Sequence, residues 1–401
     1  MFEIAKIFTD RMILQRNKPI RIFGDGDEDV TVTFDNQSAN AEVKGGKWLA
    51  ELPPHTEGGP FELRISTAKK TVILKDILVG DVWLAAGQSN MEMPLMFDLR
   101  GVEEGKNCYN DKIRFYTCSR ETHQAKTTPS WAFGWTNNEQ SPWQVCDEES
   151  ALCFSAIGYY VAKFLSKETN IPIGVISANR GCTKIDSFVP EKAFETEEFK
   201  DYLDWFNSNK VSDGEADGFY DRILKENTEN MKGYEKAAEE FAKAMTPEAA
   251  AVKTEVAIPR SKVELPLCKY SVKAPSVFYR VFIKEQLAPI SICGVLWYQG
   301  ESSRFDINYA DKFKLMAGYW REAFRDSDIP FYTVEIAAHC YPDGIVPARF
   351  RMEQWRAARI TEKTYITSTR DLGDYVNIHP HRKMEVAKQL SNQILNYTYG
   401  I

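Results

Sequence analysis

The sequence lacks the motifs of several common enzyme classes. It contains no H-E-x-x-H spacing, no glycine-rich loop followed by lysine, and no G-x-G-x-x-G. Metalloprotease, nucleoside triphosphatase and dinucleotide-binding functions therefore have no support from motifs. Histidine is scarce, so a mechanism with an imidazole base has few candidates. The five histidines are His55, His123, His339, His379 and His381.

Basic charge and long apolar runs are also scarce. The 50 Lys and Arg residues stand against 57 Asp and Glu residues, which leaves a formal net charge of −7. This balance argues against a nucleic-acid partner, because binding phosphates requires a basic face. No stretch approaches the roughly 20 apolar residues that cross a bilayer. The N-terminus is charged at Glu3, Lys6, Asp10 and Arg11, unlike a signal peptide. We therefore expect a cytoplasmic protein with no membrane partner.

Cysteine clusters are absent as well. The eight cysteines form no C-x-x-C pair and no group with histidine at zinc spacing, so we expect no metal and reduced, mostly buried thiols. Hydrophobic residues at 43% and charged residues at 27% are usual for globular proteins. A length of 401 residues allows two or three domains.

The first 75 residues are predicted to form a small antiparallel β-sandwich. Short runs rich in β-branched or aromatic residues alternate there with Gly, Asp, Asn or Pro. The runs are Pro19–Phe23, Val30–Phe34, Lys47–Leu52 and Phe61–Ser66. The pattern changes at Lys75–Leu84, where an apolar stretch resembles a buried parallel strand. We therefore predict a domain boundary near residue 75, with a second domain over residues 76–401.

The second domain alternates predicted helices and strands, which is typical of an α/β sheet. Helices are predicted over 153–167, 309–324 and 383–397, and strands over 171–177, 290–298 and 330–336. Residues from about 190 to 275 are charged and helix-prone, and we interpret them as a helical insertion with a solvated face.

Ser89 is the first candidate for chemistry. It lies in Gly87–Met91 (GQSNM), directly after the apolar stretch Val82–Ala86. A residue at that place lies at the carboxyl edge of a parallel sheet, where nucleophiles are found. The G-x-S-x-G elbow is absent, because Met91 replaces its last glycine. Serine and asparagine also favour helix N-caps and turns, so position alone leaves a structural role open.

Three other loops carry polar groups of matching chemistry. Gln299 and Glu301 follow an apolar strand and supply an amide donor and a carboxylate, although Glu is also favoured at helix N-termini. Gly181 follows another strand and can bring a backbone N–H close to a ligand, although turn glycines are common. His379 precedes Pro380 just before the last predicted helix, where a surface histidine is an equally ordinary finding. Together the four loops favour a nucleophilic hydrolase.

Five segments also carry a family resemblance. They are IFTDRMILQR (7–16), GDVWLAAGQSNMEMPL (80–95), FSAIGYYVA (154–162), GVLWYQGES (294–302) and DLGDYVNIHP (371–380). In this order they closely resemble the sialate O-acetylesterases, which belong to the wider SGNH (GDSL-like) hydrolase group. The resemblance covers nearly the whole chain except the insertion. It implies a β-sandwich followed by a flavodoxin-like, three-layer α/β/α hydrolase domain.

The resemblance also implies site roles. Ser89 would be the nucleophile and His379 the general base, and the N–H groups of Ser89 and Gly181 with the amide of Gln299 would form the oxyanion hole. Gln88, Asn90, Arg180 and Glu301 would contact the substrate. The family pattern has Asp three residues before the histidine, where this chain has Val376. The third triad member is therefore left between Asp374, which we favour, Glu301 and a backbone carbonyl near Val376. A second departure is NRGCT at 179–183 in place of WGGT.

The expected function is hydrolysis of O-acetyl esters on sugars, with sialic acid first, without a cofactor. An acetylxylan-type esterase of the same group is a close alternative. The other alternative is a non-catalytic carbohydrate-binding protein, in which Trp83, Trp297 and Tyr298 would serve as sugar platforms. The oligomeric state is not readable from the sequence.

Overall fold

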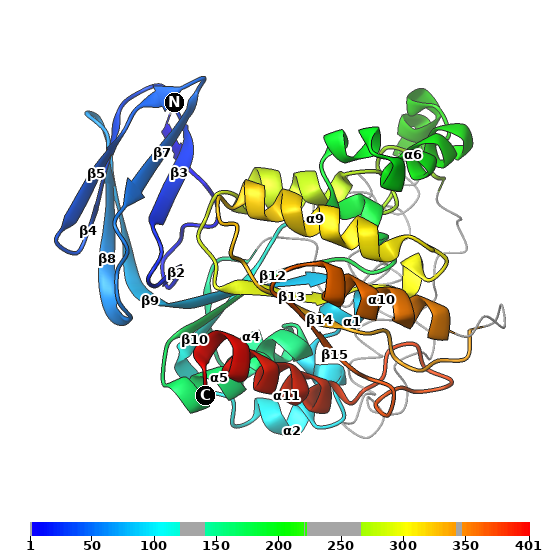
Figure 1. Cartoon of the computed structure of the whole chain (residues 1–401). Helices are drawn as coiled ribbons and strands as arrows, with labels where there is room; N and C mark the ends of the chain where they lie inside the picture. The colour runs from blue at the N-terminus through cyan, green and yellow to red at the C-terminus, as the bar shows by residue number, and fades with distance from the viewer. Residues whose placement is uncertain (1, 121–140, 220, 223–265, 342–346) are drawn as a thin grey trace.

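The chain forms two β-sheet units joined by one long strand (Figure 1). The computed structural model describes residues 2–120, 141–219, 221–222, 266–341 and 347–401. The first unit holds the N-terminus, and the second is a central sheet with helices on both faces (Figure 1). Part of the predicted helical insertion and His123 lie outside the described residues.

The N-terminal unit is built from two facing sheets. One has the order β1-β3-β7-β6, and the other contains β5, β4, β8, the first part of β9, and β2. Side chains alternate along these strands, so that Val30, Val32 and Phe34 of β4 are buried while Thr31 faces solvent. The strands are β1 (Phe2–Ile4), β2 (Ile13–Gln15), β3 (Ile20–Gly26), β4 (Val30–Phe34), β5 (Gln37–Ala41), β6 (Val43–Lys44), β7 (Lys47–Leu52) and β8 (Gly58–Ser66).

Strand β9 (Thr71–Gly87) belongs to both units. Its first half pairs with β8 and alternates in burial, as expected of a sandwich strand. From Ile77 onward every residue is buried. Residues 77–80 pair with β2 and β8, and the rest of the strand lies between β12 and β13 in a sheet covered on both faces. The predicted boundary near residue 75 therefore falls inside a continuous strand.

The central sheet has the order β11-β10-β12-β9-β13-β14-β15. All neighbouring strands of this sheet are parallel except β11, which pairs with β10 in the antiparallel direction at the edge. When β9, β12, β13, β14 and β15 are numbered along the chain, their spatial order is 2-1-3-4-5, that of a flavodoxin-like sheet. The bounds are β10 (Asn110–Thr117), β11 (Gln144–Cys146), β12 (Ile173–Asn179), β13 (Gly294–Tyr298), β14 (Phe331–Val334) and β15 (Thr364–Thr367).

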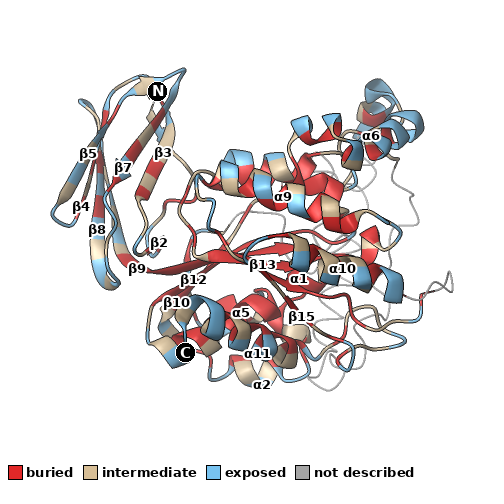
Figure 2. Cartoon of the chain, viewed as in Figure 1, coloured by how far each residue is buried: buried red, intermediate tan, exposed pale blue. Residues whose placement is uncertain are grey.

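Helices cover both faces of this sheet (Figure 1). On β13, Val295 and Trp297 belong to the core shared with α9 and α10, whereas Leu296 and Tyr298 belong to the core shared with α5 and α11. The resulting double burial is visible as a continuous red band in the sheet (Figure 2). The helices are α1 (Ser89–Glu92), α2 (Gly101–Gly105), α4 (Glu148–Leu152), α5 (Ala156–Thr169), α6 (Glu197–Asn209), α9 (Tyr309–Ala323), α10 (Ala348–Ile360) and α11 (Lys383–Ile394).

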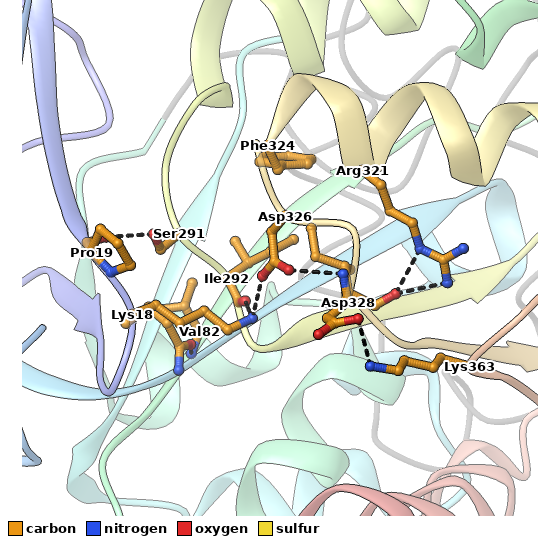
Figure 3. A network of polar contacts seen from close by, with 12 residues as sticks. Lys18, Pro19, Val82, Ser291, Ile292, Arg321, Phe324, Asp326, Asp328 and Lys363 are labelled. Atoms are coloured by element: carbon orange, nitrogen blue, oxygen red, sulfur yellow. Dashed lines mark hydrogen bonds and ion pairs between the residues drawn. The ribbon is translucent and has the colours of Figure 1, made fainter.

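Polar contacts anchor the sandwich to the second domain (Figure 3). The ammonium of Lys18 donates to the carbonyl of Ile292 at 2.7 Å and to Oδ2 of Asp326 at 2.6 Å. The hydroxyl of Ser291 donates to the carbonyl of Pro19 at 2.5 Å. These contacts lie near the amino end of β13, so they hold the sandwich away from the carboxyl edge of the sheet.

The predicted fold class is confirmed, and most predicted elements lie within a few residues of observed ones. The sequence patterns missed β10, α10 and β15. The thiols are free, but Cys153, Cys182 and Cys340 are exposed, so burial is less general than expected. Within the described ranges, no helix has the length and apolarity required to cross a membrane.

Candidate active site

Three loops begin at the same level of the central sheet. Gly87, the last residue of β9, pairs with Asn179 at the end of β12 and with Tyr298 at the end of β13. The loops that follow carry Ser89, Gly181 and Gln299. This place is the point where strand order reverses, and ligands bind there in open α/β sheets.

Gly87 makes the turn from strand to nucleophile possible. Its φ is +133°, a conformation that disfavours side chains. A Cβ on Gly87 would lie 2.2 Å from the carbonyl oxygen of Tyr298. The next N–H, that of Gln88, donates to that same carbonyl at 2.9 Å. The chain then enters α1, with Ser89 as its first residue.

Ser89 and His379 meet at this edge. The distance between Ser89 Oγ and His379 Nε2 is 2.9 Å, although 290 positions separate the residues. Both residues are partly exposed. A hydroxyl and an imidazole within hydrogen-bond distance form the arrangement in which the imidazole accepts the proton of an attacking hydroxyl. The structure therefore brings together the predicted nucleophile and base.

The loop that carries His379 is held by side chains of its own. Oδ1 of Asp374 accepts hydrogen bonds from the backbone N–H groups of Val376 and Asn377, at 2.9 and 3.0 Å. Oδ1 of Asn377 then accepts from the N–H of His379 at 2.8 Å. The carboxylate of Asp374 thus stabilises the turn, and the structure does not bring it to the imidazole.

Gln299 is also not presented to the nucleophile. Its side chain is completely buried, and its Nε2 donates to Oε1 of Gln88 (3.2 Å), the carbonyl of Thr183 (3.0 Å) and Oγ of Ser303 (3.1 Å). Its Oε1 accepts from the hydroxyl of Tyr309 at 3.0 Å. These bonds occupy the amide, so its observed role is to join the loops after β9, β12 and β13.

Gly181 packs directly against the nucleophile, since a Cβ built on it would lie 3.4 Å from the Cβ of Ser89. Its N–H, however, donates to Oε2 of Glu92 at 2.7 Å. Glu92 is buried and was not singled out from the sequence. The pKa of the nearby buried Arg120 is lowered by burial, while Glu92 opposes that shift.

The four predicted substrate contacts, Gln88, Asn90, Arg180 and Glu301, are nearly inaccessible, with exposed fractions of 1–4%. Oε1 of Gln88 accepts from the N–H groups of Gly300 and Ser302, and so fixes the loop after β13. Glu301 accepts from the carboxamide of Asn90. The side chains of Gln88, Asn90 and Glu301 therefore stabilise the loops of the site through hydrogen bonds within the protein.

Lys383 is the residue that sequence reasoning missed. It begins α11, is 1% exposed, and its ammonium donates to Oδ1 of Asn90. A lysine at a helix start in a polar segment gives no sign of burial, so no local pattern identifies it. In the parts of the chain that the structure describes, no group of His, Cys, Asp and Glu side chains is arranged to hold a metal ion.

The sheet order and the Ser–His pair agree with the flavodoxin-like hydrolase fold that the sequence predicts. A carbohydrate acetylesterase from Xanthomonas citri shares this fold, with a TM-score of 0.72, 22% identity, and coverage of 100% of this chain and 76% of that one.

Comparison of sequences shows which known proteins the chain resembles. The model for "carbohydrate esterase, sialic acid-specific acetylesterase" matches residues 236–396. Sialate O-acetylesterase from Rattus norvegicus is 22% identical over 100% of this chain and 74% of its own length. The Homo sapiens sialate O-acetylesterase is 31% identical over 26% of this chain and 23% of its own. By sequence, the chain is therefore similar to the sialate O-acetylesterases.

Proposed function

We propose that this protein hydrolyses O-acetyl esters on sugars, with O-acetylated sialic acid as the first substrate to test, by an acyl-enzyme mechanism. The observation that carries the proposal is the 2.9 Å contact between Ser89 Oγ and His379 Nε2 at the switch point of the sheet. Similarity to the sialate O-acetylesterases supports an acetyl ester as the substrate. The buried positions of Trp83, Trp297 and Tyr298 argue against the alternative in which they stack on sugars.

In the first step, His379 takes the proton of Ser89 as Oγ attacks the acetyl carbonyl carbon. The carbonyl electrons move to oxygen, which becomes a tetrahedral oxyanion. Collapse of this intermediate breaks the bond to the sugar oxygen, and His379 gives that oxygen its proton. The products of this step are the free sugar hydroxyl and an acetyl group on Ser89.

In the second step, water attacks the acetyl-serine while His379 takes its proton. The second tetrahedral intermediate releases acetate, and Ser89 recovers its proton from His379. We assign the orientation of the imidazole to the loop geometry that Asp374 maintains through Val376 and Asn377.

We assign oxyanion stabilisation first to the backbone N–H of Ser89. It lies in the first turn of α1, where helix geometry leaves N–H groups without an intrahelical acceptor. Gly181 is adjacent, but its N–H contributes only when Glu92 no longer accepts it. Loss of one such donor typically costs about 10²–10³ in rate.

The test is acetate release from a panel of acetylated sialic acid, xylose and glucose derivatives. We expect release from at least the sialic acid esters, and loss of release in Ser89→Ala and His379→Ala proteins that stay folded. Ser208→Ala, on the exposed face of α6, is the matched control and should keep full activity. Full activity in Ser89→Ala would refute the nucleophile. Release confined to xylose esters would favour the acetylxylan alternative.

A further inference from the structure

A buried polar network lies directly behind the Ser89–His379 pair. It consists of Asn90 from α1, Glu301 from the short 3₁₀ turn Glu301–Ser303 that follows β13, and Lys383 from α11. The carboxamide of Asn90 is its centre. Its Nδ2 donates to Oε1 of Glu301 and to the carbonyl of Ile378, and its Oδ1 accepts from the ammonium of Lys383.

This single carboxamide connects both members of the pair. Asn90 follows Ser89 in α1, and Ile378 precedes His379 in the loop before α11. The 3.1 Å bond between Asn90 Nδ2 and the Ile378 carbonyl therefore fixes the backbone beside the base relative to the backbone beside the nucleophile. Rotation of the Asn90 side chain would break this connection.

Glu301 and Lys383 hold that carboxamide in one orientation. The carboxylate, which only accepts, faces the amide nitrogen, and the ammonium, which only donates, faces the amide oxygen. In a flipped amide the oxygen would face the carboxylate and the nitrogen would face the ammonium, so both hydrogen bonds would be lost. Lys383 is itself anchored, because its backbone N–H donates to Oδ2 of Asp98 at 2.8 Å. The start of α11 is thereby fixed against the segment after α1.

Burial of these charged groups lowers the stability of the protein, which is unfavourable if the network has only a structural role. Burial raises the pKa of Glu301, while hydrogen bonding and Lys383 oppose the shift. Burial lowers the pKa of Lys383 to about 7, against the opposing effects of Glu301 and Asp98. The ammonium also lies 5.4 Å from the centre of the Tyr298 ring, and Oε2 of Glu301 has no hydrogen-bond partner among the described residues. Apolar side chains of the same volume usually fill such a space at lower cost.

We propose that Glu301 and Lys383 are positioning residues that orient the Asn90 carboxamide and thereby keep the Ser89 hydroxyl and the His379 imidazole at reacting distance. The inference rests on the proposed function, since it assigns these residues a role in the same reaction. We assign neither residue a contact with the substrate. A misplacement of about 1 Å in a reacting pair can reduce turnover about 10²-fold.

The experiment compares Lys383→Met and Glu301→Met with wild type. Kinetics with 4-nitrophenyl acetate and thermal unfolding are measured for each protein, together with the rate at which a fluorophosphonate labels Ser89. We expect both variants to lower kcat and the labelling rate about 10²-fold while KM changes little. Glu301→Met keeps the length of the side chain but removes the oxygen that accepts from Asn90, so it tests the proposal even when Lys383→Met does not fold.

Lys312→Met is the matched control. Lys312 is as deeply buried and pairs with the buried Asp186 at 2.7 Å, but it lies on α9 outside the network. It should change the unfolding temperature and leave kcat unchanged. Folded Lys383→Met and Glu301→Met proteins with wild-type kcat and labelling rates would overturn the proposal.

The labelling rate separates this inference from the proposed function. A wild-type protein that is labelled at Ser89 but releases no acetate contradicts the proposed function, and slower labelling in the two variants still supports the positioning role. A wild-type protein whose Ser89 is not labelled overturns the positioning role as well.

Discussion

Replacement of Gln299 by alanine distinguishes two roles for the most deeply buried amide of the site. As an oxyanion donor, Gln299 would act on kcat alone, and its loss would cost about 10²–10³ in turnover. As the structure shows it, the amide nitrogen bonds to Gln88, Thr183 and Ser303. Its removal should therefore act mainly on stability.

The loss of stability in Gln299→Ala can be estimated from the groups that lose a hydrogen-bond partner. Gln88 keeps the N–H groups of Gly300 and Ser302, and Tyr309 keeps the carbonyl of residue 299. The hydroxyl of Ser303 keeps the N–H of Ile185, whereas the buried carbonyl of Thr183 loses its donor. At about 1–3 kcal/mol for one unsatisfied group, the free energy of unfolding should fall by about 1–3 kcal/mol. For a cooperative unit of this length, the unfolding midpoint would fall by about 1–4 °C.

The assay pairs circular dichroism melting with kcat measured well below the unfolding temperature. Gln354→Ala is the control, because Gln354 is equally buried, on α10, and bonds to the same loop through the carbonyl of Gln299. We expect both variants to lose stability, with kcat reduced by less than about tenfold, below the range for loss of an oxyanion donor. An unchanged melting temperature with a kcat about 10²-fold lower would refute this reasoning and return Gln299 to the oxyanion hole.

Three further substitutions are predicted from the same geometry. Asp374→Asn keeps the oxygen that accepts from Val376 and Asn377, so kcat should stay within about tenfold of wild type, whereas a triad acid in contact with the imidazole would lose about 10⁴. A result near 10⁴ would contradict the loop role. Gly87→Ala should lower the melting temperature markedly, because its Cβ would meet the Tyr298 carbonyl at 2.2 Å; an unchanged melting curve would refute the strain. Lys383 binds fewer protons when folded than when unfolded between about pH 7 and 10.5, so its contribution to the free energy of unfolding should rise with pH there, by up to about 1.4 kcal/mol per pH unit. Urea unfolding at two pH values should show a steeper rise in wild type than in Lys383→Met, and equal slopes would contradict the shift.

The N-terminal strands were largely predictable from the sequence, whereas the joining strand was not. Val30–Phe34 alternates with period two, which a half-buried strand requires, and it became β4. Strand β9 carries both patterns in succession, alternating and then continuously apolar. The change of pattern predicted a domain boundary near residue 75. A local pattern reports burial, and it contains no information on whether one strand continues across the change.

The sequence by itself singled out Ser89 and His379, because a polar residue directly after an apolar strand and a histidine in a loop before a helix are local features. Only the tertiary structure decided what surrounds them. The amide of Gln299 bonds among three loops, the carboxylate of Asp374 bonds to its own turn, and Lys383 enters the interior beside Asn90. The contacts that Gln299 and Lys383 make with other loops join groups that lie 116 to 293 positions apart in the chain, and burial requires a hydrogen-bond partner for each of these polar groups.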